Sequence, residues 1–235
     1  MNFRHRSYQK ELLDRSDIPF ADIEQNMREL DFINTYLGGH AITLAGIKKI
    51  IAAAPTKKEW LICEIGCGGG DNLKAIHRWC ATKQIATGFM GIDINPECIA
   101  VAARKLGAIP CQLMAVDYKL ARFDQRPDVI FSSLFCHHFT DEELVSMLRW
   151  MQQHAGTGFF INDLHRHPLA YFSIKALTAL FSSSYLVKND APLSVQRGFK
   201  KEEWKQLLHA AGIQSYNVSW KWAFRYLVTV SANHA

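Results

Sequence analysis

The chain has 235 residues, and 27 lysines and arginines against 22 aspartates and glutamates give it a formal net charge of +5. With 49% hydrophobic and 21% charged residues it can bury a core, which excludes the disordered and fibrous classes. The basic excess is spread along the chain without runs of like charge, so it gives no support for binding to nucleic acid or to a membrane surface. The length suggests one large domain or a domain with an appendage.

The six cysteines show no CxxC spacing and follow no secretory leader, so we expect reduced thiols in a cytoplasmic protein. One long apolar stretch, residues 169–187, contains Lys175, Thr178 and three consecutive serines. A membrane-spanning helix would not carry polar residues at this density. We therefore expect a helix that lines or covers an apolar cavity.

The order of elements predicts an N-terminal helical cap over residues 1–55 and an α/β domain over residues 56–235. Helical periodicity covers 31–37 and 41–54, with two glycines between them. Beyond residue 55 the predicted strands are 60–65, 88–94, 111–116, 129–134, 159–164, 213–218 and 224–230. The predicted helices between them are 72–80, 97–106, 142–154 and 202–211. A helical insertion is expected over about 168–198.

Strands that alternate with helices pair in parallel through right-handed crossovers, which predicts a doubly wound sheet. Ligands of such sheets bind beyond the carboxyl ends of the strands. The residues at those ends are therefore the candidate functional residues.

The first predicted strand runs into a glycine-rich turn, EIGCGGGD, at residues 64–71. Glycines let the backbone turn tightly and approach a ligand. A dinucleotide fingerprint would have a small residue where Asp71 stands, because a carboxylate there repels a diphosphate. The pattern instead suits a ligand that ends in a zwitterionic amino acid beside a sulfonium cation.

Aspartates end the next two strands. Asp93 follows the glycines by roughly 20–25 residues, where a carboxylate can accept both hydroxyls of a ribose. Asp117 ends the third strand, where it can accept the exocyclic amine of adenine, with Ile94 and Tyr118 flanking the ring. An aspartate at a strand end is also a common helix cap or turn former, so a purely structural role is the alternative for both.

The segments EIGCGGG, GIDIN, AVDY and SSLFCHHF make residues 59–164 resemble the class I S-adenosylmethionine-dependent methyltransferases. The resemblance implies a Rossmann-like doubly wound sheet of seven strands, the last antiparallel, and S-adenosylmethionine as cofactor. It implies a cofactor site made of Glu64, Gly66 and Gly68 at the methionine and sulfonium end, Asp93 at the ribose, Asp117 at the adenine, and Leu134 beneath the cofactor. Two short segments look similar to bacterial small-molecule methyltransferases of the quinone and phenolic-lipid type, which would place Gly38 and Arg197 at the border of the active site.

Histidines follow the fourth and fifth strands, where residues 135–138 read FCHH and residues 162–168 read NDLHRHP. These strands should be neighbours, so the four histidines should meet beside the transferred methyl group. Methyl transfer is an in-line displacement that depends mainly on orientation, but a neutral imidazole can also take the proton of a phenol or enol. We expect His138 and His165 to be the candidate bases. A structural role, as a helix cap or as packing under the cofactor, is the alternative.

The same residues have other possible uses. His165 and His167 would point the same way from an extended segment, with Asp163 on that face, but such a pair has many structural explanations and no metal site is expected. Arg166 either orients an acidic acceptor or is a solvated charge. The apolar insertion either forms a lid over a hydrophobic acceptor, together with the N-terminal helices, or packs in the core.

The sequence therefore predicts methyl transfer from S-adenosylmethionine to oxygen or carbon of a small, largely apolar acceptor, with an aromatic one favoured. The Asn/Asp-Pro-Pro-Tyr/Phe signature of base-amine methylation is absent after the fourth strand, which argues against nucleic-acid acceptors. Two alternatives stay open: an NAD-dependent oxidoreductase that uses the same turn, and a non-catalytic protein that binds the cofactor.

Overall fold

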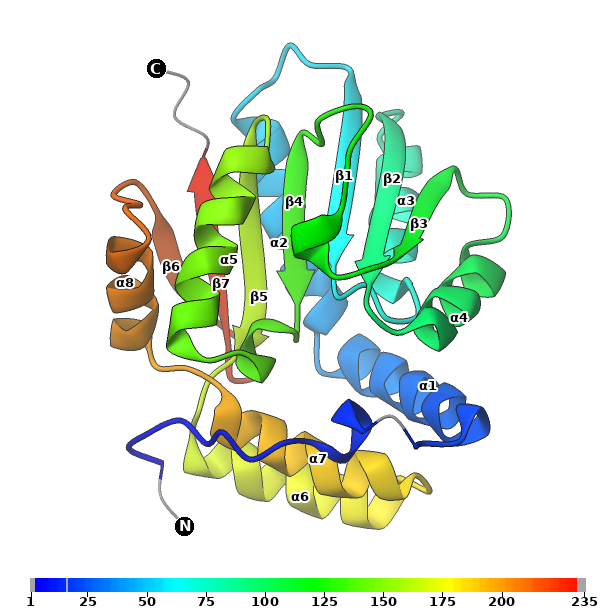
Figure 1. The fold of residues 1–235 in the computed structure, drawn as a ribbon, viewed down its shortest axis with the longest axis vertical. Helices are drawn as coiled ribbons and strands as arrows, with labels where there is room; N and C mark the ends of the chain where they lie inside the picture. Colours follow the sequence, from blue (N-terminus) through cyan, green and yellow to red (C-terminus); the bar gives the residue numbers. More distant parts are fainter. Residues whose placement is uncertain (1–2, 16, 232–235) are drawn as a thin grey trace.

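The computed structural model describes residues 3–15 and 17–231, in which helices surround a seven-stranded sheet (Figure 1). The strands are β1 (Glu59–Ile65), β2 (Ala86–Asp93), β3 (Cys111–Ala115), β4 (Val129–Ser133), β5 (Gly158–Leu164), β6 (Asn217–Lys221) and β7 (Arg225–Ser231). They lie in the order β3-β2-β1-β4-β5-β7-β6. The first five pair in parallel, and β7 runs antiparallel to both of its neighbours. The predicted Rossmann-like sheet with an antiparallel last strand is confirmed.

Helices cover both faces of this sheet. The α-helices are α1 (Phe20–Tyr36), α2 (Gly39–Ala52), α3 (Asp71–Thr82), α4 (Pro96–Leu106), α5 (Asp141–His154), α6 (Pro168–Phe181), α7 (Tyr185–Arg197) and α8 (Lys201–Ala210). The short 3-10 helices are η1 (Leu12–Asp14), η2 (Tyr118–Leu120) and η3 (Cys136–His138). Apolar side chains of α5 and α8 pack into one core and those of α2 and α3 into the other, because the central strands β1, β4 and β5 are apolar on both faces.

Local signals set the helix boundaries. Asn95 caps α4, with Pro96 as its first residue, and Thr140 and Glu143 form a capping box at the start of α5. The serines inside the apolar stretch 169–187 break it into two helices, because the Ser184 side chain caps α7. In the described ranges, no helix combines the length and the apolar character that crossing a bilayer requires.

Four helical elements, η1, α1, α6 and α7, lie beyond the carboxyl ends of the strands (Figure 1). Polar contacts join these N-terminal and inserted elements. The Asp190 carboxylate on α7 accepts hydrogen bonds from the backbone N–H groups of Leu12 and Leu13, at 2.8 and 3.0 Å. The Glu29 carboxylate on α1 accepts from the backbone N–H of Ser184 at 3.1 Å. The two segments therefore form one layer over the end of the sheet where ligands of this fold bind.

The prediction for the sixth strand is wrong in its position. We expected residues 213–218, but β6 begins at Asn217. Gly212, with a φ of +82°, ends α8, and the N–H of Ile213 donates back to the carbonyl of Leu208. Ile213 is 2% exposed, so its apolar side chain is an anchor for the connecting loop and not the first residue of a strand.

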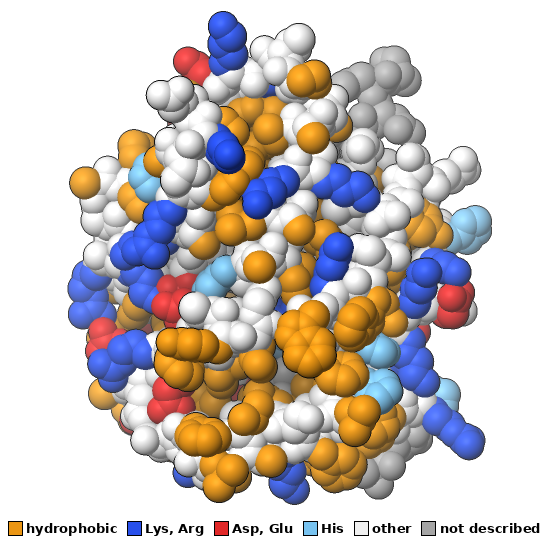
Figure 2. All heavy atoms as spheres, turned by 180° about the vertical axis from the view of Figure 1, so that it is seen from behind, with side chains coloured by type: hydrophobic (Ala, Val, Ile, Leu, Met, Phe, Trp, Pro, Cys, Tyr) orange, Lys and Arg blue, Asp and Glu red, His pale blue; other side chains and the backbone are white. Residues whose placement is uncertain are grey.

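The insertion is not fully covered. On α6, large apolar side chains are exposed at Leu169, Phe172, Leu177, Leu180 and Phe181. Hydrophobic side chains gather across the lower part of the face seen in Figure 2, at the end of the molecule where α6 lies. One side of α6 thus packs on α7 while another faces solvent.

Candidate active site

The chain turns sharply between β1 and α3, where Gly66, Gly68 and Gly70 have φ angles of 67°, 48° and 77°. The N–H of Gly66 donates to the carbonyl of Ile92 at 2.8 Å, which ties the turn to β2. A Cβ at Gly66 would lie 2.3 Å from the ring of Phe135. Glycine is thus required at position 66 both by the backbone conformation and by this ring.

Asp93, at the end of β2, holds this turn in place. Its Oδ2 accepts a hydrogen bond from the N–H of Gly68 at 2.9 Å, and its Oδ1 accepts from the N–H of Asn95 at 3.0 Å. Burial raises the pKa of Asp93, and these two N–H groups act in the opposite direction. Each carboxylate oxygen can accept a further hydrogen bond, so the group can fix the turn and still bind a ligand hydroxyl.

Glu64, the last acidic residue before the turn, is 1% exposed. Its Oε1 accepts a hydrogen bond from the Asn72 amide at 2.9 Å, whereas Oε2 has no partner among the described residues. Burial raises the pKa of Glu64 well above its ordinary value. A buried oxygen without a partner costs free energy, and a cation or a hydrogen-bond donor placed against it would recover that cost.

A chain of polar contacts continues from Asn72 through the helices around the turn. The Asn72 amide oxygen lies 3.0 Å from His40 Nδ1 on α2, and His40 Nε2 lies 3.0 Å from Asp31 on α1. Lys105 on α4 pairs with both Asp31 and Asp71. Helices α1, α2, α3 and α4 are therefore connected to the Glu64 carboxylate. The pairing of Asp71 with Lys105 could not be inferred from the sequence spacing.

Asp117 and Ile94 lie at neighbouring strand ends, because β2 pairs with β3. The Asp117 carboxylate caps η2 by accepting from the N–H of Lys119 at 2.9 Å. Ile94 is 72% exposed. The ring of Tyr118 is buried and packs edge-on against Trp150, at 5.3 Å between ring centroids. Tyr118 thus belongs to the core, whereas Ile94 and Leu120 are exposed apolar side chains near this edge.

Leu134 follows β4 in a left-handed conformation, with a φ of +54°. Its N–H donates to the carbonyl of Asn162 on β5 at 2.9 Å. The Asn162 amide in turn donates to the carbonyl of Gly39 and to Thr43, both on α2. These bonds fix the loop that carries Leu134 and Phe135 against the glycine turn.

The four histidines after β4 and β5 form two separate pairs, although these strands are neighbours as predicted. His138, which is partly exposed, has Nδ1 3.2 Å from the Asp14 carboxylate of η1. His165 packs on Tyr226, and its Nδ1 accepts a hydrogen bond from the Trp220 indole at 3.3 Å. Burial lowers the pKa of His165 to about 4, so near pH 7 the ring is neutral and its accepting nitrogen is already engaged.

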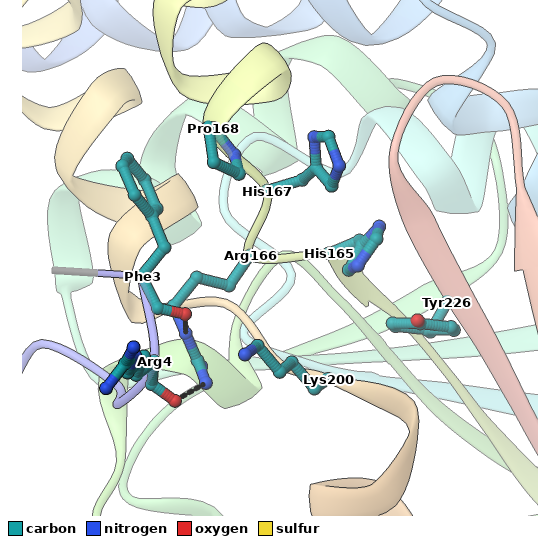
Figure 3. Close-up of a pocket in the computed structure, with 8 residues that line it drawn as sticks. All are labelled: Phe3, Arg4, His165, Arg166, His167, Pro168, Lys200 and Tyr226. Carbon is teal, nitrogen blue, oxygen red and sulfur yellow. Dashed lines mark hydrogen bonds between the residues drawn. The ribbon is translucent and has the colours of Figure 1, made fainter.

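A cavity of about 560 Å³ opens beside His165 (Figure 3). Its lining residues are Phe3, Arg4, His165, Arg166, His167, Pro168, Lys200 and Tyr226. Arg166 is 1% exposed, which contradicts the alternative of a solvated charge. Its guanidinium donates to the carbonyl of Phe3 and to the Glu203 carboxylate, and so fastens the N-terminal segment (residues 3–15) to α8. His167 caps α6 by accepting from the N–H of Leu169.

His137 lies 3% exposed beneath His138, and sequence reasoning did not select it. Its Nδ1 is 2.8 Å from the buried Asp163 carboxylate, and this contact lowers the pKa of Asp163 despite the opposing effect of burial. The Arg197 guanidinium donates to the His137 carbonyl at 3.0 Å and to the Gln9 carbonyl. Arg197 therefore supports the loop that carries the two histidines.

The N-terminal segment contributes two acidic side chains to this region that sequence reasoning missed. Glu11 is 4% exposed and accepts from the Ser194 hydroxyl at 2.7 Å, while Asp14 contacts His138. Neither residue stands in a periodic pattern or a motif. Only the folded chain brings them to the end of β4.

Replacing Gly66 with alanine tests the geometry of the turn. We expect Gly66→Ala to lower the free energy of unfolding by about 2–4 kcal/mol. The alanine would hold its backbone in the strained left-handed conformation, and its Cβ would clash with the ring of Phe135. Gly212→Ala is the matched control, since Gly212 also has a positive φ but nothing within 4 Å of an added Cβ. Urea denaturation measures both variants, and equal losses would show that the ring does not constrain the turn.

Comparison with known proteins agrees with the fold. Residues 62–158 match a family model described as a methyltransferase domain. A search of curated proteins finds no match to the sequence. Among solved structures, the chain is similar to a plantazolicin methyltransferase in complex with SAH, with a TM-score of 0.67, 18% identity, and coverage of 93% of this chain and 92% of the other.

Two further structures have the same fold. Human N-acetylserotonin methyltransferase in complex with SAM gives a TM-score of 0.63 at 17% identity, over 91% of this chain and 56% of that one. Magnesium protoporphyrin IX methyltransferase from Synechocystis with bound SAM gives 0.55 at 13% identity, over 93% and 100%. The predicted resemblance to class I methyltransferases is confirmed: residues 62–158 match the methyltransferase-domain model, and the chain has the fold of the methyltransferase structures that it resembles.

Proposed function

We propose that the protein transfers a methyl group from S-adenosylmethionine to oxygen or carbon of a small, largely apolar and aromatic acceptor in the cytoplasm. The observation that carries the proposal is the glycine turn with a carboxylate on each side. Asp93 holds the turn from the end of β2, and Glu64 lies beneath it with an unpartnered oxygen. The six cysteines are free in the structure, which supports a reducing compartment.

The residues present fit this cofactor. It supplies an electrophilic methyl group on a sulfonium sulfur when bound. The unpartnered Oε2 of Glu64 favours a positively charged ligand end over a diphosphate. Asp93 offers two acceptor oxygens at the position expected for a ribose, and Asp117 lies on the adjacent strand end at the position expected for an adenine. Gly66 and Gly68 leave the backbone open to close approach.

Apolar side chains on two sides of the glycine turn support an apolar acceptor. Met27 on α1 lies at the glycine turn, with its methyl carbon 3.8 Å from the position of a Cβ on Gly68. Phe135 lies on the other side of the turn, against Gly66. The similar methyltransferases have names that refer to plantazolicin, N-acetylserotonin and magnesium protoporphyrin IX. We extend to this chain only what these names share, which is an acceptor other than nucleic acid.

Of the two predicted bases, His138 is the better supported. Its ring lies 6.4 Å from Phe135, which contacts the glycine turn. His138 therefore lies near the proposed cofactor site. His165 has its accepting nitrogen bonded to Trp220, and its contacts are with β7 and the loop before it. We propose that His138 accepts the acceptor proton and that His165 has a secondary role.

An NAD-dependent oxidoreductase is less well supported by the same residues. Asp71 at the first position of α3 is paired with Lys105, but it still places a carboxylate where a pyrophosphate would approach the helix. Glu64 beneath the turn adds a second acidic group without a partner for one oxygen. Both carboxyls oppose a diphosphate.

Removal of the Asp93 carboxylate tests the cofactor site. We expect Asp93→Ala to lower the affinity for S-adenosylhomocysteine by roughly 2–4 kcal/mol, because charge-assisted hydrogen bonds to the ribose are lost and the turn is loosened. Calorimetric titration measures the change. Asp128→Ala is the matched control, since Asp128 also accepts a backbone N–H, from Leu61 at 2.9 Å, but precedes β4 at the other end of the sheet. An Asp93→Ala protein that binds as tightly as the wild type would refute the site.

Removal of the His138 imidazole tests the proposed base. We expect His138→Ala to lower turnover on a phenol acceptor by about 100-fold or more, with unchanged affinity for S-adenosylhomocysteine. His165→Ala serves as the comparison and should lose less activity. Single-turnover kinetics with labelled cofactor measure both variants. Equal and unaltered rates would remove an imidazole base from the mechanism and leave orientation alone.

A further inference from the structure

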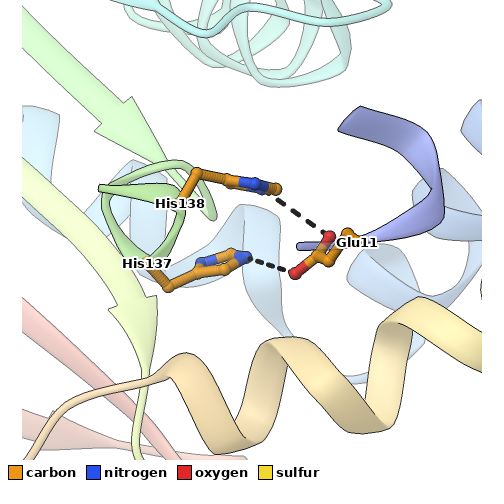
Figure 4. Close-up of side chains that lie close together, drawn as sticks. All are labelled: Glu11, His137 and His138. Carbon is orange, nitrogen blue, oxygen red and sulfur yellow. Dashed lines mark ion pairs between the residues drawn. The ribbon is translucent and has the colours of Figure 1, made fainter. Parts of the chain in front are cut away.

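Glu11, His137 and His138 bring one carboxylate and two imidazoles together at the end of β4 (Figure 4). One ligand atom from each residue lies within 4.8 Å of the other two. His137 Nε2 is 3.6 Å from Glu11 Oε1, and His138 Nε2 is 3.8 Å from Glu11 Oε2. These distances exceed the roughly 2.7–3.2 Å of an N–H···O hydrogen bond. They are near the separation of neighbouring ligands that are each about 2.0–2.2 Å from one ion.

The opposite nitrogen of each imidazole faces its own carboxylate. His137 Nδ1 lies 2.8 Å from Asp163 Oδ1, and His138 Nδ1 lies 3.2 Å from Asp14 Oδ1. In the tautomer that carries its proton on Nδ1, each ring donates to its own carboxylate and directs the Nε2 lone pair at Glu11. Histidines that bind metal ions commonly donate their other N–H to a carboxylate in this way.

The ligand atoms are held in place from several elements. The two rings lie 4.4 Å apart between centroids, with 32° between their planes, so both Nε2 atoms point the same way (Figure 4). The Ser194 hydroxyl on α7 donates to Glu11 Oε1 at 2.7 Å. Arg197 donates to the carbonyl of His137. All three candidate ligands therefore have outer contacts that orient them before any ion binds.

A simple ion pair explains the geometry less well. If both imidazoles were protonated and paired with Glu11, the charge-assisted hydrogen bonds would be about 2.7–2.9 Å long. Both observed separations are longer by several tenths of an ångström. Glu11 and His137 are 4% and 3% exposed, so bulk solvent does not screen the gap between them. A buried gap bounded by one carboxylate and two lone pairs is suited to a cation.

We propose that Glu11, His137 and His138 bind one divalent transition-metal ion, with zinc the best match to two imidazoles and one carboxylate. Three protein ligands leave at least one position of a tetrahedral ion open. His138 is the most exposed of the three side chains and lies beside Phe135, which packs against the glycine turn. An oxygen of the methyl acceptor would fit the open position; this last step rests on the proposed function, whereas metal binding does not.

The test titrates the chelator-treated full-length protein with Co²⁺, followed by absorption, and with Zn²⁺, followed by calorimetry, with no cofactor or acceptor present. We expect one equivalent to bind, with the visible bands of four- or five-coordinate cobalt. Glu11→Gln keeps the shape of the ligand and should weaken binding at least about 100-fold, and His138→Ala should do the same. Asp163→Asn, which keeps the shape of the side chain and alters the outer contact of His137, should weaken it about 10–100-fold.

The matched control removes the other closely spaced histidines. The double variant His165→Ala/His167→Ala should bind Co²⁺ as the wild type does. Circular dichroism and S-adenosylhomocysteine binding establish that each variant is folded. No binding by the wild type, or binding that survives Glu11→Gln and is lost in the double variant, would overturn the metal site.

The two proposals fail separately. A protein that binds S-adenosylhomocysteine but no metal ion contradicts only the metal site. A protein that binds the metal ion but not S-adenosylhomocysteine contradicts the cofactor assignment and leaves the metal site standing. Nε2 of His138 cannot bind an ion and accept a proton at the same time, so the base role proposed above holds only for the metal-free protein. Turnover measured with and without added Zn²⁺ separates the two roles: a fall on addition supports the base, and a rise supports an acceptor oxygen bound to the ion.

Discussion

The hydrogen bond from the N–H of Gly68 to the Asp93 carboxylate is the contact on which the rest of the site depends. It joins the turn after β1 to the end of β2, in a conformation that only glycines adopt at low cost. The same carboxylate also accepts the N–H of Asn95 at the start of α4. One side chain thus sets the separation of two strand ends, and with it the width of the space beyond them.

The polar chain from Glu64 through Asn72, His40 and Asp31 extends this constraint to the surrounding helices. Each member belongs to a different element, so a shift of α1 or α2 would break contacts that end at the buried carboxylate. Burial of such groups costs free energy unless they are paired. The series of polar contacts ends at Oε2 of Glu64, which has no hydrogen-bond partner among the described residues. This oxygen lies beneath the turn where a cofactor would bind.

Buried arginines hold the N-terminal segment in place over the carboxyl ends of the strands. Arg6 donates to the carbonyl of Arg197 and pairs with Asp141, while Arg166 donates to the carbonyls of Phe3 and Arg4. An arginine presents several donors in a fixed plane, which suits it to collecting carbonyls from separate segments. The N-terminal segment is thereby brought across the ends of β4 and β5, and with it Glu11 and Asp14.

Sequence patterns predicted the alternation of strands and helices, the doubly wound sheet and the glycine turn, because these follow from local periodicity and from conformations that require glycine. The antiparallel last strand was predicted only from the family resemblance. They did not predict contacts between distant segments. Arg166 looked like a solvated charge, although it is buried under a segment some 160 residues away in the sequence. Ile213 looked like part of a strand because an apolar side chain gives the same signal whether it lies in a strand or anchors a loop. Glu11 gave no signal, since its contacts with Ser194, His137 and His138 form only in the folded chain.

The central claim is that the space beside Glu64 and Asp93 binds S-adenosylmethionine, and with it the demethylated product S-adenosylhomocysteine, which keeps the adenosine and amino-acid ends. Thermal denaturation with increasing S-adenosylhomocysteine, and in parallel with NAD, tests it most directly, because a ligand of the native state raises the melting temperature in proportion to the logarithm of its concentration over its Kd. We expect a rise with S-adenosylhomocysteine and none with NAD. A rise with NAD alone, or with neither compound, would contradict the claim.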